Sequence, residues 1–149
     1  MGKSNERWVV KAGSSLVAGN DDGINKLFIK NLVLQVSQLL EEGIQVIIVS
    51  SGAVAKGMHE LNLNERPDSL SLLQAAAAIG QLGLIESYKS EFSNFEIKTA
   101  QVLISHDDIA NRERYLNARN SLMTLLELRV VPIINENDSV SIEEISFGD

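Results

Sequence analysis

The sequence predicts an α/β protein with an open, mainly parallel sheet and helices on both of its faces. Two observations predict this class. First, four short apolar runs rich in valine and isoleucine alternate with longer segments in which apolar residues recur at helical spacing. Such alternation makes successive strands parallel, with the connecting helices packed on the sheet. Second, small and polar residues follow the apolar runs directly, as at the carboxyl edge of a parallel sheet where ligands bind.

Length and composition limit the classes of function. The 149 residues suffice for one domain with a hydrophobic core, and 44% apolar and 22% charged residues are ordinary for a soluble globular protein. The chain contains no cysteine, which excludes disulfides, zinc–cysteine sites and thiol nucleophiles. Its only histidines are His59 and His106, so we expect no multi-histidine metal site. A net charge of −7 without a basic stripe argues against nucleic acid as the main partner.

The first residues of the chain lead directly into the first apolar run. No long apolar segment precedes that run, so we expect neither a signal peptide nor a membrane span. The default expectation is therefore a cytoplasmic protein. The sequence contains no internal repeat, low-complexity segment or linker.

The first strand is predicted at residues 8–10, and it ends in Lys11-Ala-Gly-Ser-Ser15. A glycine and two hydroxyls after a strand form a turn whose backbone can approach an anion. Lys11 is placed to add a positive charge. A β-turn with a solvated lysine explains the same residues, because they match neither the P-loop nor the dinucleotide-binding fingerprint. A helix with one apolar face follows at residues 25–42, and Gly43 ends it.

The second strand, residues 45–49, runs into Ser50-Ser-Gly-Ala-Val54 and a helix through Met58. The start of this helix would offer free N–H groups and the positive end of the helix dipole. Gly52 and Ala53 leave room for a ligand there, and Ser51 adds a hydroxyl. A plain serine N-cap is the simpler explanation. The turn repeats the arrangement after the first strand, and a parallel sheet would place both turns at one edge.

After a loop at residues 61–67, a long helix is predicted from residue 69 to about 92. Its alanine- and glycine-rich part, residues 74–83, indicates close packing, either beneath the site or against another subunit. We interpret Gln74 and Gln81 as packing residues. The third strand, residues 98–104, ends in Ser105-His-Asp-Asp108, a helix-start signal with acids in the first turn. We interpret His106 as a surface histidine rather than a catalytic base.

The next helix is predicted at residues 112–129. Its buried face is expected to consist of Tyr115, Ala118, Leu122, Leu125 and Leu126. Its arginines are expected to be solvated or paired with acids of the same helix: Arg112, Arg114 and Arg119 with Glu113 and Glu127.

The fourth strand, residues 130–134, is followed at once by Asn135, Asn137 and Asp138. A carboxylate at such an edge can bind an ammonium group or a metal, and amides can hold a carboxylate. A lysine and a glycine turn suit a phosphate. Positioning of phosphate fits best, since phosphoryl transfer mainly requires orientation and charge stabilisation. The weak alternation in residues 139–149 indicates a hairpin over the sheet edge.

Five motifs, taken in order, resemble the amino-acid kinase family, and in particular its members that phosphorylate glutamate. The resemblance covers nearly all of the chain. The Asn-Ala-Arg and Ile-Asn-Glu-Asn-Asp segments are specific to those members, whereas the lysine–glycine turn is shared across the wider family. The motifs are Val9-Val-Lys-Ala-Gly-Ser-Ser15, Val49-Ser-Ser-Gly-Ala53, Gln74-Ala-Ala-Ala-Ala-Ile-Gly-Gln81, Arg112-Glu-Arg-Tyr-Leu-Asn-Ala-Arg119 and Pro132-Ile-Ile-Asn-Glu-Asn-Asp138.

The resemblance implies an enzyme, a transferase that uses ATP and Mg²⁺ to convert the side-chain carboxylate of L-glutamate to γ-glutamyl phosphate, the first step of proline biosynthesis. It also implies feedback inhibition by proline and a homo-oligomer. By the same resemblance, Lys11 neutralises charge on the transferred phosphoryl group, and Gly13 and Ser14 lie at the ATP phosphates. The implied glutamate-binding residues are Ser51, Gly52, Ala53, Asn135, Asp138 and Asp149, with Asp138 at the α-ammonium group and Asn135 in support. No residue is assigned to a metal.

In this comparison, residues 1–149 correspond to the N-terminal, amino-acid-binding part of the kinase domain. The family's second half holds most of the nucleotide pocket, a second phosphate-binding lysine and the acid that positions the lysines. A C-terminal RNA-modification-type domain is also not included. We therefore expect this chain alone to be inactive. Two other interpretations stay open: a module that senses glutamate or proline without catalysis, and a related kinase with another small acid or phosphate as substrate.

Overall fold

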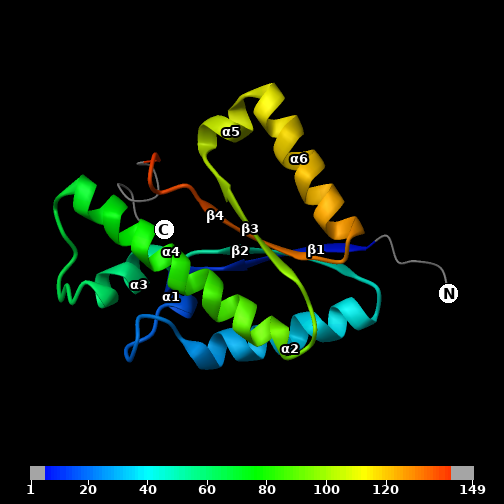
Figure 1. The fold of residues 1–149 in the computed structure, drawn as a ribbon, viewed down its shortest axis with the longest axis horizontal. Helices are drawn as coiled ribbons and strands as arrows, with labels where there is room; N and C mark the ends of the chain where they lie inside the picture. The colour runs from blue at the N-terminus through cyan, green and yellow to red at the C-terminus, as the bar shows by residue number, and fades with distance from the viewer. Residues whose placement is uncertain (1–5, 142–149) are drawn as a thin grey trace.

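Four parallel strands form one sheet in the order β1-β2-β4-β3 (Figure 1). The computed structural model describes residues 6–141, and the structural statements below concern those residues. The strands are β1 (Arg7–Ala12), β2 (Gln45–Ser50), β3 (Thr99–Ile104) and β4 (Val131–Glu136). The predicted class, an α/β fold with a parallel sheet, is confirmed.

Helices cover both faces of the sheet, although unequally. One face carries α1 (Ser14–Val17), α2 (Lys26–Glu41), α3 (Ala53–Glu60) and α4 (Leu70–Ser93). The other carries α5 (His106–Ala110) and α6 (Arg112–Glu127), which stand apart above β3 and β4 in Figure 1. The sequence did not predict α1, and it identified α5 only as a helix-start signal.

The hydrophobic core lies between the sheet and the helices α2 and α4. Alternate residues of the two central strands point into it, namely Val46 and Ile48 from β2 and Val131 and Ile133 from β4. They meet fully buried side chains of the two helices, among them Ile29, Val33, Tyr88 and Phe92. Burying each large apolar side chain stabilises the fold by about 1.5–3 kcal/mol, so this layer fixes the position of the strand ends.

Helix α3 crosses α4 so closely that the two backbones touch. A Cβ atom at Gly57 would overlap the carbonyl group of Ala76, and one at Gly80 would overlap that of Ala53. The prediction that the small-residue segment packs closely is therefore confirmed, with α3 as its partner. By length and composition α4 could also cross a membrane. Its buried stripe of Leu84, Tyr88 and Phe92 in the core is what a core helix of a globular protein shows.

One expectation for α6 was wrong, and the expectation for its three arginines, which are exposed, was wrong only for the partner of Arg114. Of the five residues predicted on its buried face only Leu126 is buried, and the side chain of Tyr115 is 46% exposed. The apolar stripe of α6 faces a cavity above the sheet rather than closely packed side chains. Arg114 bonds Asp108 at 3.1 Å instead of an acid of its own helix. The hairpin expected at residues 139–149 lies mostly outside the described residues.

Candidate functional site

Three parallel strands end side by side at the carboxyl edge of the sheet. The pairing of β1 with β2 places Ala12 beside Ser50, and the backbone N–H of Ser51 donates to the carbonyl oxygen of Ala12 at 2.9 Å. The pairing of β2 with β4 continues this row to Asn135. The segments that follow these strands therefore meet at one edge, as the sequence predicted.

The turn after β1 is held by backbone hydrogen bonds. The carbonyl oxygen of Gly13 accepts from the N–H groups of Leu16 at 3.0 Å and Val17 at 3.1 Å, which starts the short helix α1 at Ser14. Gly13 has an ordinary φ of −73°, and no atom lies within 4 Å of the place where a Cβ would stand. The fold itself does not require glycine there, and open space remains beside the exposed Lys11.

The turn after β2 does require glycine. Gly52 has φ of +109°, and a Cβ there would lie 2.8 Å from Cγ1 of Val17. Gly52 is the N-cap of α3 and makes no side-chain capping bond, so the simpler explanation by a serine N-cap is wrong. The first N–H groups of α3, starting at the buried Ala53, have no partner within the helix and carry its positive dipole end. This turn can bind an anion.

The end of β4 carries two buried polar residues. Asn135 is 5% exposed and Asp138, in the turn after the strand, is 8% exposed. The side-chain amide of Asn135 donates to Oε1 of Gln81 at 2.8 Å, and its oxygen accepts from the backbone N–H of Glu136 at 2.8 Å. A carboxylate as deeply placed as Asp138 is poorly screened by water, so it attracts a cation more strongly than a surface acid does.

A second buried hydrogen bond ties α4 to the same edge. The hydroxyl groups of Ser50 and Tyr88 lie 2.9 Å apart, and Ser50 Oγ also donates to the carbonyl oxygen of Ser51 at 3.1 Å. Burial raises the pKa of Tyr88, and the bond to Ser50 offsets part of that rise. Tyr88 therefore remains a neutral hydroxyl, able to hold the end of β2.

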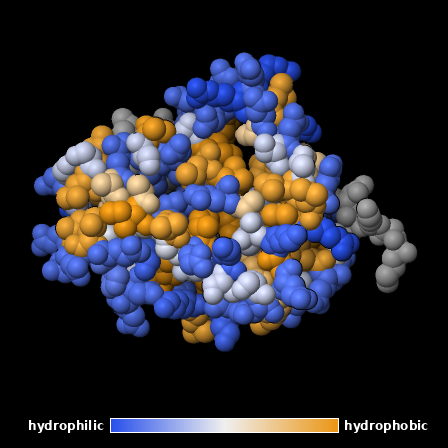
Figure 2. Space-filling view, in the orientation of Figure 1, coloured by the Kyte–Doolittle hydropathy of each residue, from blue (hydrophilic) through white to orange (hydrophobic). Residues whose placement is uncertain are grey.

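A cavity of about 760 Å³ opens on the other face of the sheet, beneath α5 and α6. Figure 2 shows apolar residues gathered in the hollow between these helices and the sheet. Lys11, Ser51 and Asn135 line the cavity, so it joins three of the predicted site residues. The other described candidates, Gly13, Ser14, Gly52, Ala53 and Asp138, lie on the edge segments around it but not in its wall. Asp149 lies outside the described residues.

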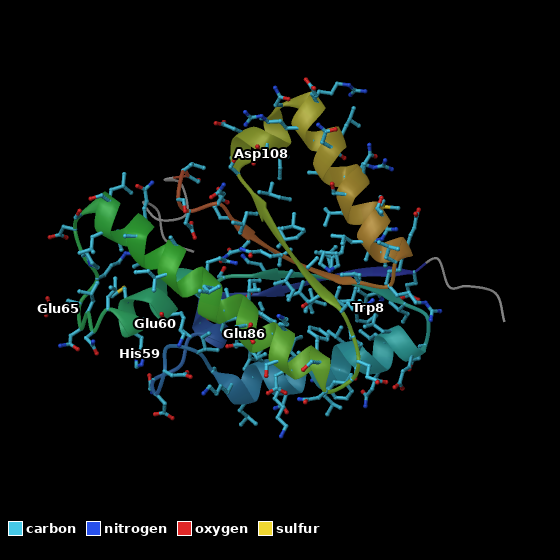
Figure 3. All side chains as sticks on the ribbon, in the orientation of Figure 1. Trp8, His59, Glu60, Glu65, Glu86 and Asp108 are labelled. Atoms are coloured by element: carbon cyan, nitrogen blue, oxygen red, sulfur yellow. The ribbon has the colours of Figure 1, made fainter. Side chains whose placement is uncertain are left out.

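The loop after β3 closes one side of this cavity. Ser105 and Asp108 form a capping box, in which the Asp108 carboxylate accepts from the backbone N–H and the hydroxyl of Ser105, both at 2.8 Å. These bonds, together with Arg114, hold the pKa of Asp108 below its usual range. Figure 3 shows Asp108 at the start of α5, far from His59 and Glu60 on α3. His59 therefore does not belong to this edge.

Sequence reasoning missed Gln81 and Tyr88 as parts of the edge. Gln81 was interpreted as a packing residue, and its bond to Asn135 spans 54 positions of the chain. The available signal was a single amide, Gln81, on the stripe of α4 that otherwise carries small and apolar residues.

Comparison with known proteins agrees with this architecture. The profile of the family described as "Amino acid kinase family" matches residues 6–149. This chain belongs to the amino acid kinase family. The match includes all four strands and every described segment of the candidate edge.

Curated members of this family are similar over nearly the whole chain. A glutamate 5-kinase of Hydrogenovibrio crunogenus and one of Nitrosococcus oceani are each 52% identical over 147 residues, which is 99% of this chain. A glutamate 5-kinase of Paraburkholderia phymatum is 54% identical over 143 residues, or 96% of the chain. The chain spans only 38–39% of the length of these relatives.

Proposed function

We propose that this chain is the amino-acid-binding part of a kinase that transfers phosphate from ATP to the side-chain carboxylate of L-glutamate. The observation that carries the proposal is the arrangement at one sheet edge of the Lys11 strand end, the first turn of α3 and the buried carboxylate of Asp138. A cation and free N–H groups suit phosphate and carboxylate oxygens, whereas a buried carboxylate suits an ammonium group. The relatives named glutamate 5-kinase supply the choice of glutamate.

In the proposed complex, Asp138 pairs with the α-ammonium group of glutamate. Asn135 supports this contact from the end of β4. Ser51 and the backbone N–H groups of Gly52 and Ala53 hold a carboxylate group of the substrate, because the start of α3 favours negative charge. Asp149, beyond the described residues, remains a predicted glutamate contact.

In the proposed transfer, an oxygen of the side-chain carboxylate attacks the γ-phosphorus of ATP. The bond from that phosphorus to the bridging oxygen breaks, and ADP leaves with the electron pair. The product is an acyl phosphate, γ-glutamyl phosphate. Lys11 stabilises the charge on the transferred group, and the open turn at Gly13 and Ser14 accommodates the phosphates. Such positioning and charge stabilisation is most of what phosphoryl transfer needs from a protein.

Mg²⁺ finds no ready-made site in this part of the chain. Within residues 6–141, no group of three or more histidine, aspartate or glutamate side chains could hold a metal ion. Mg²⁺ usually binds through substrate phosphates with one or two carboxylates. We therefore keep Mg²⁺ as the expected companion of ATP and assign no step to it. Inhibition by proline, assembly as a homo-oligomer and a cytoplasmic location likewise stay predictions.

The test uses the complete kinase, that is, residues 1–149 joined to the part that follows them in the relatives. We expect glutamate-dependent release of ADP from ATP. Asp138→Ala should raise KM for glutamate by much more than about tenfold, because the α-ammonium group of the bound glutamate would be left without its charged partner. Lys11→Ala should act mostly on kcat. Lys98→Ala, at the opposite end of the sheet from Lys11, is the control and should change neither constant.

An unchanged KM in Asp138→Ala would remove that residue from the proposed site. Calorimetry and a substrate panel then separate the two interpretations left open by the sequence. Glutamate binding by a complete chain that never turns over ATP would favour a sensing module. Turnover with a different small acid in a substrate panel would favour a related kinase instead.

A further inference from the structure

Gln81 is a buried amide in the middle of α4, with half of its hydrogen-bonding capacity unused. It is 9% exposed, and its Oε1 accepts from the Asn135 side chain at 2.8 Å. Its Nε2 is buried and has no hydrogen-bond partner among residues 6–141. A buried donor without an acceptor typically costs about 1–3 kcal/mol. The bond to Asn135 accounts for the oxygen of this amide but not for its nitrogen, and the other buried residues of α4 are small, apolar or aromatic.

The orientation of the two amides follows from the backbone. The oxygen of Asn135 must face the N–H of Glu136, which only donates. The Asn135 nitrogen therefore faces Gln81, and Gln81 must present its oxygen in return. Nε2 of Gln81 is thus fixed as an unused donor, and rotating the amide by 180° would break the bond to Asn135.

The position of Gln81 places this donor beside the candidate edge. The preceding residue, Gly80, touches the backbone of Ala53 in the first turn of α3. On its other side, Gln81 bonds the end of β4, three residues before Asp138. Figure 1 shows α4 lying alongside α3 below the sheet. Gln81 therefore lies between the two segments to which the substrate has been assigned.

We propose that Gln81 is a further substrate-recognising residue, whose Nε2 donates a hydrogen bond to a carboxylate oxygen of the bound amino acid while its Oε1 orients Asn135. This inference rests on the proposed function, because it takes an amino acid with a carboxylate as the ligand of the edge. Gln81 thereby serves two roles from one amide: it fixes a neighbouring side chain and supplies a charge-assisted hydrogen bond.

Two substitutions separate these roles. Gln81→Leu removes both the donor and the acceptor at similar volume. Gln81→Glu keeps an oxygen for Asn135 but replaces the donor with negative charge. If Nε2 binds substrate, both variants should raise KM for glutamate by at least about tenfold, and Gln81→Glu should raise it more than Gln81→Leu. KM for ATP should stay unchanged. Gln74→Leu, two turns earlier on the same helix, is the matched control and should leave KM near the parent value.

The outcomes are distinguishable from failure of the proposed function. If the parent kinase shows no glutamate-dependent turnover, the proposed function fails before any variant is made. If the parent is active and Gln81→Glu keeps the parent KM, the donor is unnecessary and this inference is overturned. If Gln81→Glu does not fold, Gln81→Leu decides: a loss of the glutamate-induced rise in melting temperature supports the inference, and a full rise overturns it.

Discussion

The crossing of α3 and α4 leads to a prediction opposite to the one that helix propensity gives. Replacing glycine by alanine inside a helix normally stabilises it by about 1 kcal/mol. At Gly80 the added Cβ would lie 2.9 Å from the carbonyl carbon of Ala53 and still closer to its oxygen. The oxygen contact, at 1.8 Å, is the closest, and because a Cβ atom does not approach another heavy atom within about 3.0 Å, the backbone of α3 would have to retreat by at least about 1.2 Å.

The magnitude follows from the kind of atoms involved. Overpacking typically costs about 1–3 kcal/mol, and the contact at Gly80 is with backbone, which no change of rotamer relieves. Taking about 3 kcal/mol for the clash and about 1 kcal/mol for the propensity gain, we expect Gly80→Ala to lower the free energy of unfolding by about 2 kcal/mol. The melting temperature should fall by about 4–8 °C.

Gly83 in the same helix provides the control. A Cβ there would meet Cε of Lys56 at 2.6 Å and Oε1 of Glu60 at 2.9 Å, which are side-chain ends rather than backbone atoms. The two side chains are joined at 3.4 Å, and Nζ of Lys56, whose side chain is 14% exposed, also donates to the carbonyl oxygen of Asp22 at 2.9 Å. Gly83→Ala should therefore stabilise by up to about 1 kcal/mol. Urea unfolding of both variants against the parent measures the difference. A Gly80→Ala variant as stable as Gly83→Ala would refute the reasoning, because α3 would then yield without cost.

Two further predictions concern the strand-end turns. Gly13→Ala should leave the unfolding midpoint unchanged or slightly raised, since a Cβ there meets no atom within 4 Å, while KM for ATP in the complete kinase should rise; an unchanged KM would argue against phosphate at this turn. Asp108→Asn should destabilise the protein at neutral pH but not in acid. The lowered pKa of Asp108 stabilises the folded state above the unfolded pKa, near pH 4, and this stabilisation is lost as pH falls through the folded pKa. Urea midpoints of Asp108→Asn and of the neighbouring Asp107→Asn, compared with the parent from about pH 3 to pH 7, test this, and a difference that persists in acid would contradict it.

The strands and main helices could be predicted because each carries a local signal. The run of valine and isoleucine in β2 has the length of a strand, and the apolar face of α2 repeats at helical spacing. The turns after β1 and β2 each lie where an apolar run ends and small residues begin. These signals depend only on residues that are close together in the sequence, so they can be recognised without knowledge of the fold.

The order of the strands and the polar contacts of α4 could not be predicted in the same way. β4 lies between β2 and β3, and the apolar runs themselves do not encode that order. The bond of Gln81 to Asn135 joins residues 54 positions apart, and that of Tyr88 to Ser50 joins residues 38 apart. Amides and tyrosines on a helix are usually solvated or packed singly, so a prediction from the sequence favours the ordinary case.

Helix α4 couples the stability of the fold to the geometry of the candidate site. Three of its positions reach three different segments of the edge: Gly80 touches the first turn of α3, Gln81 bonds the end of β4, and Tyr88 bonds the end of β2. Each interior glycine costs the helix about 1 kcal/mol relative to alanine, but only glycine allows the backbone contact with α3. A change at one of these three contact positions should therefore alter glutamate binding, because each contact positions a segment of the candidate edge. On this argument, Gly80→Ala should also raise KM for glutamate in the complete kinase, whereas Gly83→Ala should not.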